Sequence, residues 1–158
     1  MGRSNFYKNI KMEKSLSNDY IKSNKHETVR LSRFTKKYGQ MVMNSTEDGK
    51  DRQERSQTLV DYLCEKFGIA PVKVMVTALK RPSRGRGQVY GFYTPSNHKI
   101  TIYNTTAKTC KPTTIKTFFD TLIHEFIHHY DYQVLKLGDS FHTTGFYKRI
   151  DDLKNKLI

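Results

Sequence analysis

Residues 121–130 read TLIHEFIHHY, a run in which apolar side chains surround His124, Glu125 and His128. On an α-helix, residues four apart project from one face, so the imidazoles of His124 and His128 would lie one turn apart. This spacing suits two nitrogen ligands on one Zn²⁺ ion at about 2.0–2.1 Å. Glu125 would lie beside the metal, where its carboxylate can take a proton from water and pass it to a leaving amine. The run therefore predicts a buried helix with a hydrolytic zinc site, in which Glu125 is the catalytic residue.

A zinc site that hydrolyses its substrate needs a third protein ligand and an open fourth position. Glu125 is the last glutamate of the chain, which excludes a glutamate downstream of the helix as the third ligand. The remaining candidates are His129, Asp131, Asp139 and His142.

These candidates differ in where a helix would place them. His129 directly follows His128 and is rotated by about 100° from it, which makes it a poor partner. Asp131 would lie about two turns from the first histidine of the motif. His142 follows Gly138, a residue type that often ends helices, so the chain can fold back over the metal there. We therefore expect one Zn²⁺ per chain, bound by the two motif histidines and His142.

The rest of the chain predicts further helices and a small sheet. Apolar residues at helical spacing predict helices over residues 28–43, 57–68 and 112–137, and a last helix that contains Phe146, Ile150, Leu153 and Leu157. Alternating and β-branched residues predict strands over residues 71–79, 88–94 and 99–104. We expect these strands to form a three-stranded antiparallel sheet packed on the long helix, which is an α+β fold.

Composition divides the chain into three parts. Residues 1–26 are polar and aperiodic, and we expect them to be a disordered basic tail. Residues 27–56 contain the first amphipathic helix and a polar linker at 44–56. Residues 57–158 contain the strands and the zinc motif, and we expect them to form the catalytic domain of a monomer.

Positive charge is concentrated in the middle of the chain. The formal net charge is +13, and residues 71–117 contain nine Lys or Arg and no acidic residue. Four basic residues lie close together, at Lys80, Arg81, Arg84 and Arg86, and three aromatic residues follow, at Tyr90, Phe92 and Tyr93. Basic side chains neutralise phosphates and aromatic rings stack on unpaired bases, so this segment predicts a contact with nucleic acid.

Composition also excludes several classes of protein. No run of 18 apolar residues exists, which excludes a membrane-spanning helix. The first residues lack the apolar core of a signal peptide. Cys64 and Cys110 are too few for a disulfide framework or a four-cysteine zinc site. We expect an intracellular protein of the cytoplasm, associated with the nucleoid if it binds DNA.

Three residues near the motif are candidates for supporting roles. Asp120 precedes the motif by one turn and Asp131 lies further along the same helix, so either carboxylate could orient a ligand imidazole. Tyr132 lies one turn after the second motif histidine and could reach an oxyanion. The strand KITIYN at 99–104 could offer its edge to an extended protein substrate.

The segments HEFIHHYDYQ (124–133) and FHTTGFYKRI (141–150) resemble the SprT-like (Spartan-type) zinc metallopeptidases. That family combines H-E-x-x-H with a third histidine downstream and a helix that opens near H-x-x-x-F. Here thirteen residues separate His128 from His142, and His142-Thr-Thr-Gly-Phe146 fits the second pattern. The strand–turn–strand pattern GFYTPSNHKITIYN fits the family's short sheet, so the resemblance covers about residues 57–158.

The resemblance implies a minimal zincin-like metalloprotease domain that binds Zn²⁺ through His124, His128 and His142, with Glu125 as general base and acid. It also implies a zinc endopeptidase with DNA as a partner, which acts in DNA repair on protein substrates bound or crosslinked to DNA. Two other functions stay open. The first is a DNA-independent regulatory protease with a narrow substrate. The second is a zinc-stabilised nucleic-acid-binding module without peptidase activity, whose function would survive Glu125→Gln.

Overall fold

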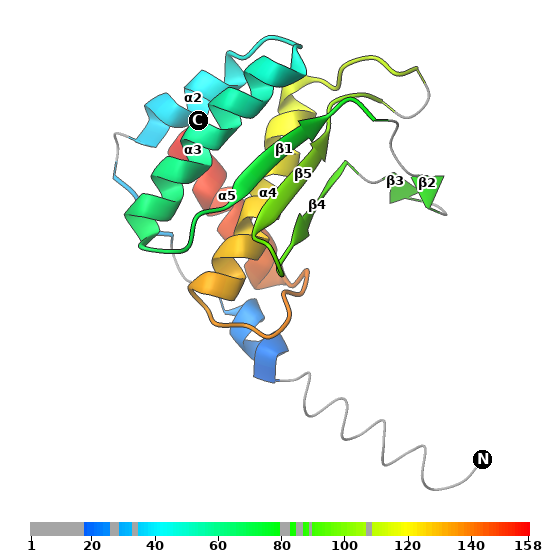
Figure 1. Cartoon of the computed structure of the whole chain (residues 1–158). Helices are drawn as coiled ribbons and strands as arrows, with labels where there is room; N and C mark the ends of the chain where they lie inside the picture. Colours follow the sequence, from blue (N-terminus) through cyan, green and yellow to red (C-terminus); the bar gives the residue numbers. More distant parts are fainter. Residues whose placement is uncertain are drawn as a thin grey trace, which may run out of the picture.

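The computed structural model describes residues 18–25, 29–32, 35–79, 83–84, 87–88, 90–106 and 109–158. Helices come first along the chain, then a small sheet, then two more helices, and Figure 1 shows helices packed against the sheet. This arrangement confirms the α+β class. Among the described helices, none combines the length and the apolar composition that a bilayer crossing requires.

The N-terminal part of the described chain is helical. Residues 18–24 form a short helix, so the expected disordered tail over 1–26 is wrong for this part. Ser23 is fully buried, and its hydroxyl lies 2.9 Å from that of Thr143, near the other end of the chain. The backbone of this segment lies close to the C-terminal helix at Gly145, where a Cβ atom would lie 2.5 Å from backbone atoms of Ser23 and Asn24.

Helix α2 (Lys36–Met43) is shorter than the helix expected over 28–43, because residues 29–32 adopt no regular secondary structure. Val29 and Val42 are fully buried and belong to the same apolar core as residues after position 57. The part of 27–56 that the structure describes is therefore packed into the main domain.

Helix α3 (Gly49–Phe67) covers much of the expected linker at 44–56, so that expectation is wrong beyond residue 48. Asp48 caps the helix by accepting a hydrogen bond from the Lys50 amide, and the Lys, Arg, Gln and Glu residues that follow are good helix formers. The helix ends before Gly68, as the sequence predicts, and the φ of +63° at this residue suits glycine.

The main sheet contains β1 (Lys73–Thr77), β4 (Gly91–Thr94) and β5 (Lys99–Tyr103) in the order β1-β5-β4. β4 and β5 form an antiparallel hairpin, as expected, but β1 pairs with β5 in parallel, with Lys73 opposite Lys99. The expected all-antiparallel sheet is therefore wrong. The tight turn between β4 and β5 makes these two strands antiparallel. The connection after β1 is longer, so β5 can lie between β1 and β4 and run in the same direction as β1. That connection also contains the short antiparallel strands β2 (Ser83–Arg84) and β3 (Gly87–Gln88).

Helix α4 (Ile115–Gln133) lies against β4, β5 and α5 (Thr144–Leu157). It is shorter than the helix expected over 112–137 because Thr114 caps it and Pro112 pairs with Thr105 in an isolated bridge. One face of α4 is fully or almost fully buried, through Phe118, Phe119, Leu122, Ile123, Phe126 and Ile127. This packing fixes the helix against the sheet and leaves the motif residues at the edge of the core.

Candidate metal centre

Three imidazoles meet beside the C-terminal half of α4. His124 and His128 come from successive turns of the helix, and His142 comes from the segment that leads into α5. Nε2 of His142 lies 3.2 Å from Nε2 of His124 and 3.0 Å from Nε2 of His128. Each of the three residues offers one ring nitrogen as a ligand atom, and these three nitrogens lie within 4.8 Å of one another. The structure thus brings together the three residues that the sequence singled out, and their binding of zinc stays a prediction.

The imidazoles of the helix are held in their neutral form. Burial lowers the pKa of His124 to about 4 and that of His128 to about 3, and the neighbouring imidazoles act in the same direction. Neutral imidazoles have the free lone pair that a metal ligand needs. Four-coordinate nitrogen ligands at about 2.0–2.1 Å from zinc lie roughly 3.3 Å apart, which is close to the separations seen here. The three side chains therefore fit a zinc ion in chemistry and in spacing.

The other candidates for a third ligand lie elsewhere. His129 points away from the cluster, and its ring nitrogens contact the Tyr93 hydroxyl and the Ala70 carbonyl, each at 2.7 Å. Asp131 is fully buried against Arg149. The rotation of successive residues on a helix explains why the ring of His129 points away.

Glu125 lies next to the imidazoles on the side of β4. Its side chain is almost completely buried, and this burial raises the pKa of its carboxyl to about 7 from the ordinary 4.5. A hydrogen bond from the backbone of Tyr93 acts in the opposite direction. A carboxyl with a pKa near neutrality can both accept and donate a proton, which is the property that a general base and acid needs.

An open cleft passes over Glu125. A cavity of about 590 Å³ lies on one side, lined by Tyr90, Asp120 and Thr121 among others. A second cavity of about 340 Å³ lies on the other side, lined by Phe92 and Tyr132 among others. Both cavities reach the same four residues, namely Gly91, His124, Glu125 and His142. The cluster is therefore accessible from two sides along β4.

Gly91 explains how β4 comes so close to α4. A Cβ atom at this position would lie 2.7 Å from the backbone oxygen of Thr101 and 2.8 Å from Cγ2 of Thr121. Only glycine fits there without a shift of the strand or the helix. The residue thus sets the width of the cleft at its centre.

The three predicted supporting residues have different partners. Asp120 lines the larger cavity and forms an ion pair with Lys154 at 2.6 Å, and no described contact joins it to an imidazole. Asp131 lies behind the cluster, and among the described contacts it is joined to His128 only through Ser140. The Tyr132 hydroxyl lies 3.4 Å from Asp139 and lines the smaller cavity, so its contact with an oxyanion stays a prediction.

The roles of Ser140, Arg149 and Tyr93 at this site are not predicted by the sequence. Ser140 contacts Nδ1 of His128 at 2.8 Å, Arg149 pairs with Asp131, and Tyr93 contacts both Glu125 and His129. The position of Ser140, two residues before His142, was the one signal available. The other two contacts join residues far apart in the sequence.

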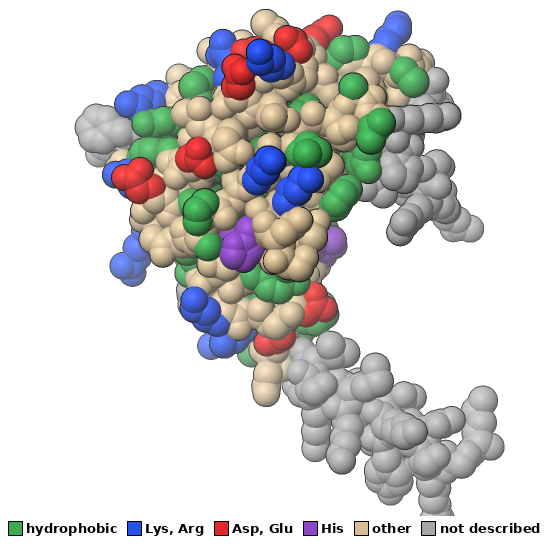
Figure 2. All heavy atoms as spheres, viewed as in Figure 1, with side chains coloured by type: hydrophobic (Ala, Val, Ile, Leu, Met, Phe, Trp, Pro, Cys, Tyr) green, Lys and Arg blue, Asp and Glu red, His purple; other side chains and the backbone are tan. Residues whose placement is uncertain are grey.

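The expected basic contact surface lies largely outside the part of the chain that is described. Lys80, Arg81 and Arg86 are outside the described residues, and Arg84 lies in β2 with its side chain not described. On the face shown in Figure 2, histidine side chains reach the surface with Lys or Arg side chains nearby.

Comparisons with family models, curated proteins and solved structures find no match for this chain.

Proposed function

We propose that this protein is a zinc-dependent endopeptidase. The observation that carries the proposal is the convergence of His124, His128 and His142 beside Glu125 in an open cleft. A purely structural zinc site has a closed set of four ligands and needs no carboxyl group of this kind. The accessible cluster and the adjacent buried glutamate support a hydrolytic role.

The three histidines and Glu125 would have different roles in peptide hydrolysis. A zinc ion held by the three imidazoles supplies Lewis acidity toward a carbonyl oxygen and toward water. Glu125 would accept a proton from the attacking water at its carboxylate and then donate it to the leaving amine. The raised pKa of Glu125, about 7, suits both steps near neutral pH.

The edge of β4 is the best candidate for binding an extended substrate. Strand order in the sequence favours the strand at 99–104 for this role, but β5 is central and pairs on both sides. That expectation is therefore wrong. In the described sheet β4 pairs only with β5, and residues of β4 line both cavities. A substrate-bound structure with the peptide away from β4 would contradict this assignment.

The proposed substrates are proteins bound or crosslinked to DNA. The net charge of +13 and the resemblance to SprT-like metallopeptidases support this choice. A protein of this charge would accumulate on DNA at low salt, which would bring DNA-bound proteins to the cleft.

The test is cleavage of a DNA-linked protein by the zinc-loaded chain, with and without free single-stranded DNA. Glu125→Gln is the control, because it keeps the shape and removes the carboxylate. Cleavage that requires both Glu125 and DNA would support the proposal. Cleavage that requires Glu125 but is indifferent to DNA would support a regulatory protease with a narrow substrate. A nucleic-acid-binding module would bind DNA and zinc equally well as wild type and as Glu125→Gln, and neither protein would cleave the substrate.

A further inference from the structure

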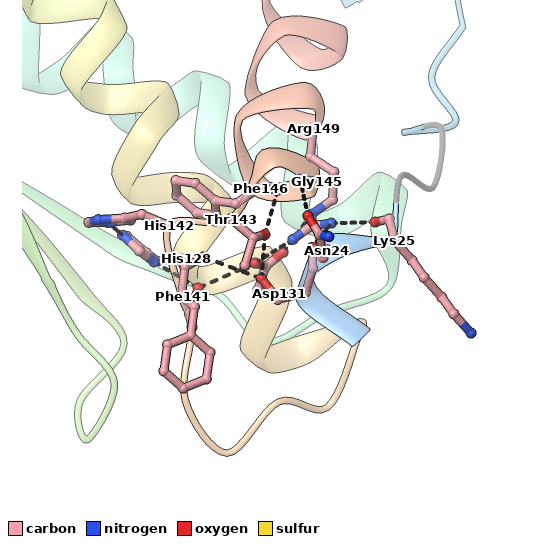
Figure 3. Close-up of polar contacts among 12 residues, drawn as sticks. Asn24, Lys25, His128, Asp131, Phe141, His142, Thr143, Gly145, Phe146 and Arg149 are labelled. Atoms are coloured by element: carbon pink, nitrogen blue, oxygen red, sulfur yellow. Dashed lines mark hydrogen bonds and ion pairs between the residues drawn. The ribbon is translucent and has the colours of Figure 1, made fainter. Parts of the chain in front are cut away.

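A buried series of polar contacts leads from His128 away from the cleft. Nδ1 of His128 lies 2.8 Å from the Ser140 hydroxyl, which donates a hydrogen bond to Asp131 at 3.3 Å. Figure 3 shows these contacts continuing from Asp131 to Arg149 and to the N-terminal segment. The side chains of Asp131 and Arg149 are both completely shielded from solvent.

The directions of these hydrogen bonds determine the tautomer of His128. Arg149 donates to both oxygens of Asp131, at 3.0 and 2.9 Å, so the carboxylate is the acceptor of the series. Ser140 has one hydroxyl hydrogen, which it donates to Asp131. In its contact with His128, the Ser140 oxygen must therefore accept a hydrogen bond, and the donor is Nδ1–H of His128. Nε2 of His128 therefore has the free lone pair, and it faces His142.

The N-terminal segment completes the surroundings of Arg149. Nη1 of Arg149 donates to the backbone oxygens of Ser23 and Lys25, each at 2.8 Å. Asn24 accepts a hydrogen bond from the Gly145 amide at 3.2 Å, near the start of α5. Without residues 23–25, Nη1 of Arg149 would lose both of these acceptors, so the segment completes the hydrogen bonding of a buried charged group.

We propose that Ser140, Asp131, Arg149 and the segment 18–25 form a support that fixes His128 in the tautomer able to bind zinc. Ser140 is the positioning residue that contacts the ligand, and the N-terminal segment holds the far end of the support. Partners of this kind typically contribute about 10–100-fold to metal affinity. The inference rests on the proposed metal binding but does not require peptidase activity.

The first experiment tests Ser140 in the full-length chain. Zinc affinity is measured by competition with a chelator, and the His128 tautomer is read from imidazole ¹⁵N chemical shifts in the metal-free protein. We expect Ser140→Ala to bind zinc about tenfold more weakly and to lose the preference for Nδ1–H. Ser140→Thr should restore both, because it keeps the hydroxyl. Ser45→Ala is the matched control, because its hydroxyl bonds the backbone oxygen of Val42, far from the cluster. Unchanged affinity and tautomer in Ser140→Ala would overturn the proposal.

The second experiment tests the N-terminal segment without deleting it. A Cβ atom on Gly145 would lie 2.5 Å from backbone atoms of Ser23 and Asn24, so Gly145→Ala should push the segment away. Alanine also favours helix, so α5 itself should not be weakened. We expect zinc affinity to fall about tenfold and the His128 tautomer to become mixed.

Gly49→Ala is the control for this variant, because a Cβ at Gly49 would make only ordinary contacts at 3.5 Å or more. Equal zinc affinity in the two alanine variants would overturn the role of the segment. Zinc binding with the expected dependences but without any peptide cleavage would support this inference and refute only the proposed peptidase function.

Discussion

The hydroxyl of Tyr93 lies 2.7 Å from Nδ1 of His129, and Nε2 of the same ring lies 2.7 Å from the carbonyl oxygen of Ala70. A carbonyl oxygen only accepts, so Nε2 carries the hydrogen and Nδ1 accepts from Tyr93. His128 and His129 are neighbours in the sequence but are held as opposite tautomers. One faces the candidate metal centre, and the other joins α4 to β4.

Replacement of Tyr93 by Phe should destabilise the protein. The change leaves Nδ1 of the fully buried His129 without its donor, which costs about 1–3 kcal/mol. Urea unfolding measures this loss, and zinc affinity should stay unchanged because the hydroxyl is not part of the cluster. Tyr103→Phe, on the neighbouring strand, is the control. Equal stability of the two variants would show that the Tyr93–His129 contact contributes nothing.

Zinc should stabilise the folded chain, and this stabilisation should depend on His142 as the third proposed ligand. A ligand that binds only the native state at 100 times its dissociation constant adds about 2.7 kcal/mol to the free energy of unfolding. Thermal unfolding with added zinc should therefore shift upward in the wild type, and a chelator should reverse the shift. His142→Ala should lose most of this shift, and His98→Asn, outside the cluster, should keep it. An equal shift in His142→Ala would rule out the proposed ligand set.

The stability of the metal-free protein should fall as the pH drops below about 6.5. Burial lowers the pKa of His124 to about 4 and of His128 to about 3, from the ordinary 6.5, so the unfolded chain binds more protons in this range. Glu125 acts in the opposite direction, because its raised pKa of about 7 makes the folded state bind one proton more between pH 7 and 4.5. Burial also lowers the pKa of His129, so the histidines together outweigh one carboxyl and the net effect is a loss.

Urea unfolding in the presence of a chelator at several pH values between about 6.5 and 5 measures this dependence. Glu125→Gln removes the opposing contribution, so its stability should fall with a steeper slope than that of the wild type. Equal slopes in the two proteins would show that Glu125 titrates as it does in the unfolded chain.

Gly91→Ala should separate β4 from α4. The added Cβ would lie within 2.8 Å of Thr101 and Thr121 atoms, and such overpacking costs about 1–3 kcal/mol. Because Gly91 lines both cavities, cleavage should fall more than zinc affinity does. A variant with wild-type stability and wild-type cleavage would show that the strand adjusts freely.

Much of the local structure could be predicted from residue patterns. The spacing of His124 and His128 placed both on one helix face, and Gly68 marked the end of α3. The three strands of the main sheet also lie within the expected ranges, whereas β2 lies outside them. The polar stretch at 49–56 was misread as linker because its apolar residues are few, although its helix propensity and its Asp48 cap were visible.

Periodicity and spacing in the sequence were sufficient for the motif helix and for the expectation that His142 lies near it, because a helix repeats every 3.6 residues and Gly138 allows the chain to turn back. They were not sufficient for the parallel pairing of β1 with β5, because any two strands with free edges can pair. Nor could they reveal that Arg149 joins Asp131 to backbone atoms more than 120 residues earlier. Those contacts depend on burial of a charged pair within the folded core, where each polar atom must find a partner, and only the complete packing of the chain provides those partners.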